Sequence, residues 1–378
     1  MRRTTRAKAL LPLALLLALG PVAPARAQSD ARGALAPLPD SQVVLFVNAR
    51  RIINDLLPRI MPAADYRKLI GDPQKVGFDV RQLDYAAVAV RFADQTPASG
   101  LPEFLVVVRG GFSADSLLML ARLAAGSQNL KSRQETYGPK MLDIFETETV
   151  ARAVGGADGS EGPAGGKPRS NPYPEVALTT LDSRTLVAGV PAYVKAAIDA
   201  SGGRGRLSAP TLDLAAREPQ ALWSLTAVLP PTLADYVHKF GVPPNEELDK
   251  TLAWLKQFSL SQGMDALDLT LRAALLTDQP EHASALSGLA RMGLVAFQTE
   301  LAGEAAKKEN KDAANARRVL SILKTVVNRT EGSTLFISAA VPVSVVAELV
   351  RKQSARQPAT NARRRTTRRH SRRPTRRH

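Results

Sequence analysis

The sequence predicts an α+β protein built from two tandem, related modules, each a mostly antiparallel sheet with helices packed on one face. Three observations lead to this prediction. The chain of 378 residues is longer than one typical domain, and its apolar fraction of 44% is that of a globular protein. Short apolar runs alternate along it with segments of helical periodicity. The second half also repeats, in order, features of the first half.

Residues 1–27 have the three parts of a secretory signal peptide. Four basic residues lie between Arg2 and Lys8, an apolar run follows at Ala9–Leu19, and Ala25-Arg26-Ala27 is a small-x-small cleavage site. The run is short for a membrane span, and the later sequence has no stretch of eighteen apolar residues. We therefore expect a bacterial protein exported to the periplasm or beyond, with residues 28–37 as a linker and no transmembrane helix in the mature chain.

The first module is predicted at residues 38–200. Val43–Val47 has the β-branched and aromatic composition of a buried strand, and Arg51–Ile70 has helical spacing interrupted by two prolines. Ser113 is placed to cap a helix whose leucines, from Leu117 to Leu123, would share one side. The other predicted elements are strands at Tyr85–Phe92, Glu103–Arg109, around Thr136–Glu146, Val176–Leu181 and Thr185–Ala188, and a helix at Pro191–Ala200.

Residues 154–174 interrupt this module with six glycines and four prolines, a composition too poor in apolar residues to order itself. We predict a flexible surface insertion there. A Gly-rich stretch at Ser201–Arg206 then indicates the boundary between the modules.

The second module is predicted at residues 207–352. Its predicted elements are a strand at Leu222–Leu229, helices from Pro231 and around Leu248–Phe258, a strand within Gly263–Gln279, a helix at Glu281–Leu301, and a strand, turn, strand and helix over Val326–Leu349.

Internal similarity suggests that the modules arose by duplication. Gly263–Gln279 resembles Gly77–Gln95, since both begin Gly-x-Asp, alternate in polarity and end Asp-Gln. The long helix at Glu281–Leu301 follows as a helix follows in the first module. Val326–Leu349 matches Val176–Ile198, each being a strand, an acidic turn, a Thr-Leu strand and a Val-Pro that opens a helix.

The same elements resemble a group of uncharacterised exported bacterial proteins. The similarity lies in Leu38-Pro39 leading to Val47, in Gly77–Asp84, and in Leu181–Gly189. It covers roughly residues 38–352 and stops before the C-terminal segment. The resemblance implies an architecture and export, and it implies no reaction.

The formal net charge of +16 is concentrated at the two chain ends. Residues 28–352 carry 36 basic and 35 acidic side chains, so the body is almost neutral. Residues 353–378 contain ten arginines, no acid and no aromatic residue, which predicts a disordered tail without base-stacking groups. Guanidinium groups bind phosphate and carboxylate. The predicted anion-binding residues of the tail are Arg363, Arg364, Arg365, Arg368, Arg369, Arg372, Arg373, Arg376 and Arg377.

An anionic envelope polymer or lipid surface is the partner that this tail favours in an exported protein, and nucleic acid would bind only nonspecifically. An incidental arginine run with no selected purpose is an equally good account of the same residues.

The sequence offers no catalytic or metal-binding constellation. It contains no cysteine and no Gly-x-Ser-x-Gly elbow. His238, with Asp235 three residues before it, and His282 are interpreted as surface or structural residues. Asp79 and Asp265 are interpreted as turn or cap residues. Asp268 lies three residues after Asp265 in an alternating segment, where the two carboxylates would point apart. We predict no catalytic residue, no metal and no cofactor.

The leading functional hypothesis is therefore a non-enzymatic exported protein of the cell envelope, with a binding or structural role and a tail that tethers it to anionic surfaces. One alternative is a carboxylate-based hydrolase with its site between the modules. The other is a nonspecific polyanion- or DNA-binding protein.

Overall fold

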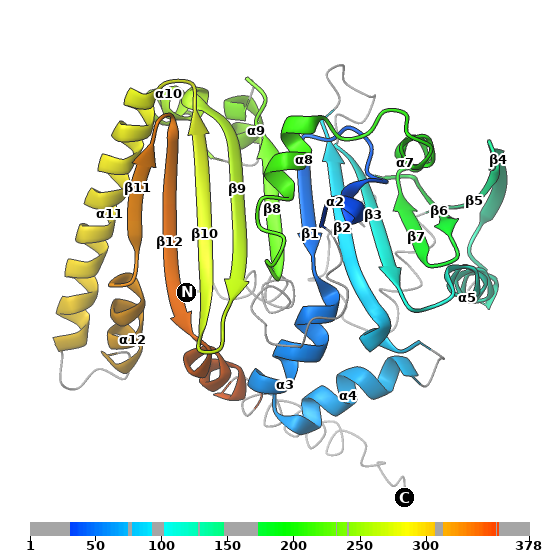
Figure 1. The fold of residues 1–378 in the computed structure, drawn as a ribbon, viewed down its shortest axis with the longest axis horizontal. Helices are drawn as coiled ribbons and strands as arrows, with labels where there is room; N and C mark the ends of the chain where they lie inside the picture. The colour runs from blue at the N-terminus through cyan, green and yellow to red at the C-terminus, as the bar shows by residue number, and fades with distance from the viewer. Residues whose placement is uncertain are drawn as a thin grey trace, which may run out of the picture.

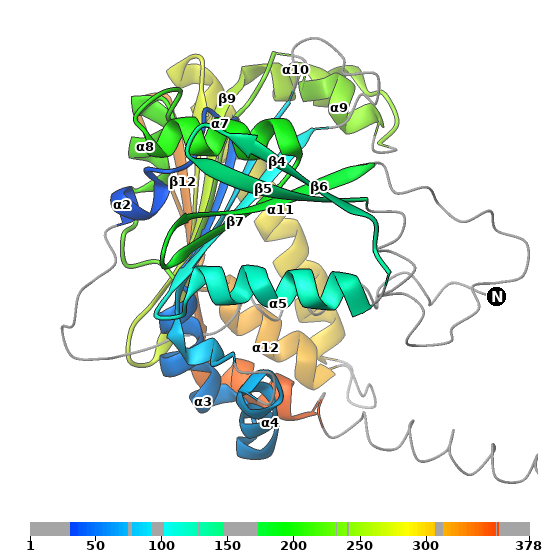
Figure 2. The same ribbon diagram turned by 90° about the vertical axis from the view of Figure 1, so that its right-hand side faces the viewer.

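One antiparallel sheet of twelve strands runs through the part of the chain that the structure describes, in the order β11-β12-β10-β9-β8-β1-β2-β3-β7-β6-β5-β4 (Figure 1). The computed structural model describes residues 31–74, 78–92, 102–127, 129–146, 173–231, 233–239, 242–306, 313–352 and 354. Helices lie on both sides of the sheet (Figure 2). The predicted α+β class and the antiparallel sheet are confirmed.

The first half of the sheet contains β1 to β7 and the helices between them. Its strands are β1 Val43–Val47, β2 Leu83–Arg91, β3 Glu103–Gly110, β4 Ser132–Tyr137, β5 Lys140–Glu146, β6 Glu175–Asp182 and β7 Thr185–Gly189. Its helices are α2 Ala31–Leu35, the π-helix η1 Arg51–Leu56, α3 Leu57–Ile60, α4 Ala63–Gln74, the 3-10 helix η2 Val80–Gln82, α5 Ala114–Ser127 and α7 Pro191–Ser201.

The second half begins with α8 and contains β8 to β12. Its strands are β8 Trp223–Val228, β9 Leu255–Met264, β10 Asp268–Thr277, β11 Val327–Glu331 and β12 Thr334–Pro342. Its helices are α8 Ala209–Ala215, α9 Leu233–Lys239, α10 Glu246–Trp254, α11 Pro280–Ala306, α12 Ala313–Leu323 and a C-terminal helix at residues 343–352.

The two halves have the same strand order outward from the middle of the sheet. β1 and β8 pair with each other along five residues, Val43↔Ala227 to Val47↔Trp223. From there the order is β1-β2-β3-β7-β6 on one side and β8-β9-β10-β12-β11 on the other, with β5 and β4 added beyond β6. The halves are thus joined by a continuous backbone ladder.

The front face of the sheet, which carries Val44 and Phe46 of β1 and faces the viewer in Figure 1, is apolar and covered in the first half. These side chains pack with buried residues of β2, β3 and β7 and with Tyr193, Val194 and Ala197 of α7. Helices α2 and α8 join the same core, since Leu35 and Ala215 are buried in it. Burial of these side chains removes them from water and stabilises the first half.

The back face, which carries Leu45 and Val47, has a core of its own. The buried Ile52 and Leu56 of η1 pack there with Trp223 of β8. Ala347 and Val350 of the C-terminal helix are buried in the same cluster. Helices α5, α11 and α12 also lie on this side of the sheet (Figure 2).

The C-terminal helix explains an asymmetry between the halves. Both α7 and the C-terminal helix follow the outer hairpin of their half, after β7 and β12 respectively. Helix α7 packs on the front face, whereas the C-terminal helix packs in the back core. As a result, no described helix covers the front of β9, β10, β12 and β11 (Figure 1).

Most predicted elements are present close to their predicted bounds, and their local causes are visible. Val43–Val47 is a strand as predicted. The Ser113 hydroxyl accepts a hydrogen bond from the Ser116 amide and caps α5 as expected. Pro191 occupies the first turn of α7, where a missing N–H costs nothing.

Four predictions need correction. Helices pack on both faces of one continuous sheet, and not on one face of each of two sheets as predicted. The helix predicted around Leu248–Phe258 ends at Trp254, and the chain continues directly as strand β9. Within the predicted linker, residues 31–35 form helix α2, whose Leu35 is fully buried. In α5, Leu118 is buried but Leu123 is exposed, so the leucines do not share one buried side.

Several predicted segments lie outside the described residues. These are the signal peptide at residues 1–27, nearly all of the insertion at residues 154–174, and the tail from residue 355. At the end of the insertion, Tyr173 is described and packs edge-on against Phe104, with ring centroids 4.8 Å apart. No helix in the described ranges is long and apolar enough to cross a membrane.

Candidate anion-binding groove on the open sheet face

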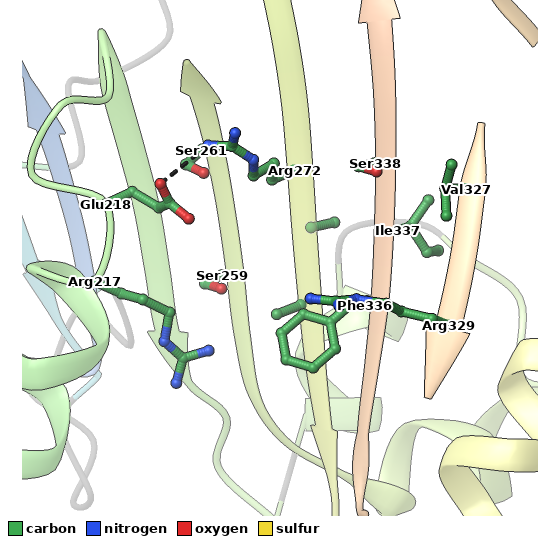
Figure 3. Close-up of a pocket in the computed structure, with 12 residues that line it drawn as sticks. Arg217, Glu218, Ser259, Ser261, Arg272, Val327, Arg329, Phe336, Ile337 and Ser338 are labelled. Carbon is green, nitrogen blue, oxygen red and sulfur yellow. Dashed lines mark hydrogen bonds and ion pairs between the residues drawn. The ribbon is translucent and has the colours of Figure 1, made fainter. Parts of the chain in front are cut away.

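A groove of about 410 Å³ lies on the uncovered front face of the second half (Figure 3). We call it the open groove. Its floor consists of side chains from β9, β10, β12 and β11, and Arg217 and Glu218 reach it from the segment that follows α8. The residues that line it on this face are Arg217, Glu218, Ser259, Ser261, Arg272, Ala274, Val327, Arg329, Phe336 and Ser338.

Strand register places these side chains in two rows across the sheet. Arg272 of β10 pairs with Ser261 of β9 on one side and with Ser338 of β12 on the other. Two residues further along, Ala274 pairs with Ser259 and with Phe336 in the same way. Because side chains alternate between the faces of a sheet, both rows point to the front.

Apart from Phe336, the residues of these rows are small or polar where the first half is apolar. The corresponding front positions of β2 and β3 include Ala87 and Leu105, which are buried in the front core. Serine and arginine at the front of β9 and β10 could not pack a helix as tightly, and they tolerate exposure to water. The sequence of these strands is thus consistent with their lack of cover.

Three arginines bring positive charge to the open groove. Arg272 Nη1 lies 3.0 Å from Glu218 Oε2, so the positive charge of Arg272 is partly balanced. The Arg329 guanidinium lies over the Phe336 ring, 5.0 Å from its centroid, and Nη1 is 3.0 Å from Glu331 Oε1. Arg217 is exposed, and its guanidinium makes no hydrogen bond or ion pair with any residue that the structure describes.

This arrangement can hold an anion. Guanidinium groups donate paired hydrogen bonds to carboxylate and phosphate oxygens. Arg217 and Arg329 approach the groove from opposite sides, with serine hydroxyls between them (Figure 3). Glu218 is the one carboxylate in the lining, and it is engaged by Arg272.

A second cavity, of about 280 Å³, lies in the first half near α2. Its lining includes Tyr85, Arg109, Asp182 and Arg206. Arg109 Nη1 is 2.9 Å from Asp182 Oδ2, and burial raises the pKa of Tyr85 to about 12. The Arg206 Nε donates a hydrogen bond to the Ala200 carbonyl oxygen, so both guanidiniums of this cavity have internal partners, and the phenol stays neutral. The open groove also contains Arg217, which has no partner among the described residues, and it therefore offers more to an anion.

The two histidines named from the sequence lie elsewhere. His238 Nε2 is 2.9 Å from Asp249 Oδ1, and Nδ1 is 3.0 Å from the Val242 carbonyl oxygen. Asp235 is therefore not its hydrogen-bonding partner. His282 lies with Nδ1 2.6 Å from Asp278 Oδ1, and its ring stacks on Trp254 at 4.2 Å.

The aspartates interpreted as turn or cap residues have those roles. The Asp79 carboxylate accepts a hydrogen bond from the Arg81 amide and caps η2. Its side-chain hydrogen bond with Arg81 lowers its pKa to about 2. Asp265 lies in the turn between β9 and β10, where its Oδ1 accepts hydrogen bonds from the amides of Leu267 and Asp268. Those hydrogen bonds lower the pKa of Asp265.

The predicted site between the modules has no counterpart among these cavities. The β1–β8 ladder fills the junction, and the open groove and the second cavity each lie within one half. Among the described residues, no group of three or more His, Asp or Glu side chains is arranged to hold a metal ion. The predicted anion-binding arginines of the tail, Arg363 to Arg377, lie outside the described ranges.

Sequence reasoning missed every residue of the open groove. The alternation Phe258-Ser259-Leu260-Ser261 was a usable signal for a strand with one polar face. No local signal marks Arg217, Arg272 or Arg329, because strand order alone brings them together.

Comparison with known proteins adds a distant likeness in fold. No protein family and no curated protein matches the chain. Six chains of solved structures match, and they include crystal form IV of TP0453, with a TM-score of 0.41, 13% identity and coverage of 85% of this chain and 99% of that chain. Crystal form III of TP0453 has a TM-score of 0.40 and 12% identity and covers 84% of this chain and 96% of that chain. Likeness at this level assigns no activity.

Proposed function

We propose that this is a non-enzymatic exported protein of the cell envelope that binds an anionic partner in the open groove. The observation that carries the proposal is the set of three arginines around a bare, serine-lined sheet face. Arg217 in particular is exposed and has no partner among the residues that the structure describes. A guanidinium in that position is available to a carboxylate or phosphate.

The lining favours binding over hydrolysis. General acid–base chemistry needs a titratable group that is free to exchange protons with the substrate. In the open groove Glu218 is held by Arg272, and neither His238 nor His282 belongs to the lining.

Export and duplication remain part of the proposal. The pattern of residues 1–27 and the resemblance of residues 38–352 to exported bacterial proteins support secretion. The shared strand order of the two halves supports duplication. By position in the sheet, β3 corresponds to β10, and β6 and β7 correspond to β11 and β12. The similar sequence segments Gly77–Gln95 and Gly263–Gln279, however, contain β2 and β10. This sequence match is therefore shifted by one strand relative to the structural correspondence of the two halves.

Titration with citrate tests the groove. Full-length protein is titrated calorimetrically with citrate, and Arg217→Gln is compared with Arg67→Gln, which removes the same charge from an exposed position on α4. We expect Arg217→Gln to weaken binding by about tenfold or more and Arg67→Gln to leave it unchanged. Equal affinity of both variants would show that the groove does not hold the anion.

The tail is proposed to tether the protein to an anionic surface. Ten arginines without a compensating acid in residues 353–378 support this role. Deleting those residues should release the protein from envelope fractions into the soluble fraction, and the loss should resemble the effect of high salt. If the shortened protein fractionates like the full chain, the tail is not a tether.

A further inference from the structure

The open groove is wider than a single anion needs. Its lining extends from Arg217, beside β8, to Arg329 on β11. Neighbouring strands lie about 4.8 Å apart, so the floor from β9 to β11 crosses three spacings, or roughly 14 Å, and Arg217 extends the lining beyond β9. Its volume of about 410 Å³ lies within the range of sites for whole small molecules. A ligand that uses the whole groove would be elongated and would lie across the strands.

The charged groups are separated along this length. Arg217 and Arg329 enter from opposite sides, and Arg272 is between them, turned toward Glu218 (Figure 3). Guanidiniums that held one phosphate would converge on one point. Separated guanidiniums match a chain with an acidic group on successive units.

The surface between the arginines carries serine hydroxyls beside apolar side chains, among them Phe336 and Val327. Ser259, Ser261 and Ser338 each offer a group that can both donate and accept a hydrogen bond. Ligands rich in hydroxyl groups have the matching capacity. Ala274 leaves the floor flat beside them.

Other chain-like ligands fit this surface less well. The one aromatic ring of the lining, Phe336, is already covered by Arg329, so it gives no free platform for a nucleic-acid base. The groove lies on a sheet face whose backbone groups are paired within the sheet, so a peptide could not add as a strand.

We infer that the open groove binds a short stretch of an acidic polysaccharide, with uronate carboxylates at Arg217 and Arg329 and sugar hydroxyls on the serines between them. This inference rests on the proposed function and names the ligand class for it.

The test uses oligosaccharides of known length and charge. The full-length protein is titrated with tetragalacturonate, galacturonate, the neutral galactose tetramer and a tetra-aspartate peptide at fixed ionic strength. We expect tetragalacturonate to bind at least about tenfold more tightly than the monomer, because it reaches a second guanidinium. The neutral tetramer should bind weakly, and the peptide should not match tetragalacturonate.

Variants identify where the oligomer lies. Arg217→Gln and Arg329→Gln should each weaken tetragalacturonate binding, because one oligomer spans both sides, while Arg67→Gln should not. Ser259→Ala removes a hydroxyl without changing charge and should weaken the oligomer by roughly twofold to tenfold. Circular dichroism confirms that each variant is folded.

The possible failures are distinguishable. If tetragalacturonate binds but no groove variant alters its affinity, the arginine-rich tail is the binding element and the inference is wrong. Tighter binding of tetra-aspartate at the same arginines would assign the groove to an acidic peptide instead. If citrate binding depends on Arg217 but the tetramer gains nothing over the monomer, the glycan inference fails and the proposed function stands. If no anion responds to Arg217→Gln, both fail.

Discussion

Gly189 ends β7 at a point where two neighbouring strands crowd its backbone. It pairs with Leu105 of β3 and with Ala177 of β6. A Cβ atom at this position would lie 2.4 Å from the Phe104 carbonyl oxygen and 2.9 Å from Leu105 Cα. Both are backbone atoms of β3, which cannot move away as a flexible side chain could, so only glycine fits between these strands.

Gly189→Ala should therefore destabilise the protein. Overpacking of this kind costs about 1–3 kcal/mol, because the β3–β7 spacing would have to widen. Gly71→Ala is the control, since Gly71 lies in α4 with nothing within 4 Å of the added Cβ, and it should stabilise by about 0.5–1 kcal/mol. Urea unfolding of both variants measures the difference, and an unchanged midpoint for Gly189→Ala would contradict the crowding.

Among the elements, the α9–α10 pair is held by a histidine with two acceptors. Nδ1 of His238 faces the Val242 carbonyl and Nε2 faces Asp249, with Asp235 also nearby on α9. Both ring nitrogens must carry a proton to donate to both acceptors. The hydrogen bond to Val242, followed by the charge and hydrogen bond of Asp249, raises the pKa of His238 above its ordinary value of 6.5.

The sign of the pH effect follows from that direction. A raised pKa in the folded state means that the fold favours the protonated ring, so the stabilisation is complete below about pH 6.5 and is lost as the pH rises through the raised pKa. We expect amides of α9 and α10 to lose protection from hydrogen exchange, after correction for intrinsic rates, between pH 5.5 and 8.5.

His238→Gln should abolish this pH dependence, while amides of α11 should show none in either protein. Loss of protection with the same pH profile in the variant would assign the effect to another group.

The elements themselves were largely predictable from the sequence, and the groove was not. Strands such as Val43–Val47 are apolar on both faces and bounded by turn residues, which gives a strong local signal. Strand β9 follows α10 with no turn residue between Trp254 and Leu255, so the helical pattern was extended too far. Arg272 and Arg329 are brought together by pairing through β12, and no sequence spacing encodes that arrangement.

At the scale of the whole molecule, the two halves should unfold together. The β1–β8 ladder joins them, and the back core combines Ile52 and Leu56 of the first half with Trp223 and Ala347 of the second. Buried contacts that cross the junction couple the free energies of unfolding of the two halves.

Ile144→Ala tests this coupling from the far side of the first half. Ile144 lies in β5 and is 1% exposed, so its truncation should cost about 2–5 kcal/mol. Both tryptophans, Trp223 and Trp254, lie in the second half. We expect their fluorescence midpoint in urea to fall together with the midpoint from circular dichroism. Leu123→Ala, at a 63% exposed position, is the control and should change little.

Two separated transitions for Ile144→Ala, with the tryptophan signal unmoved, would mean that the halves are independent despite the shared sheet.

The course of the C-terminal helix places the end of the described chain and the open groove on opposite sides of the sheet. Because this helix packs in the back core, the chain passes residue 352 on the side of the sheet away from the open groove. A protein held to a surface through its last residues would then present the groove outward. The proposed function then predicts that each molecule cross-links two separate anionic bodies, and that removal of either attachment abolishes bridging while the other binding activity persists.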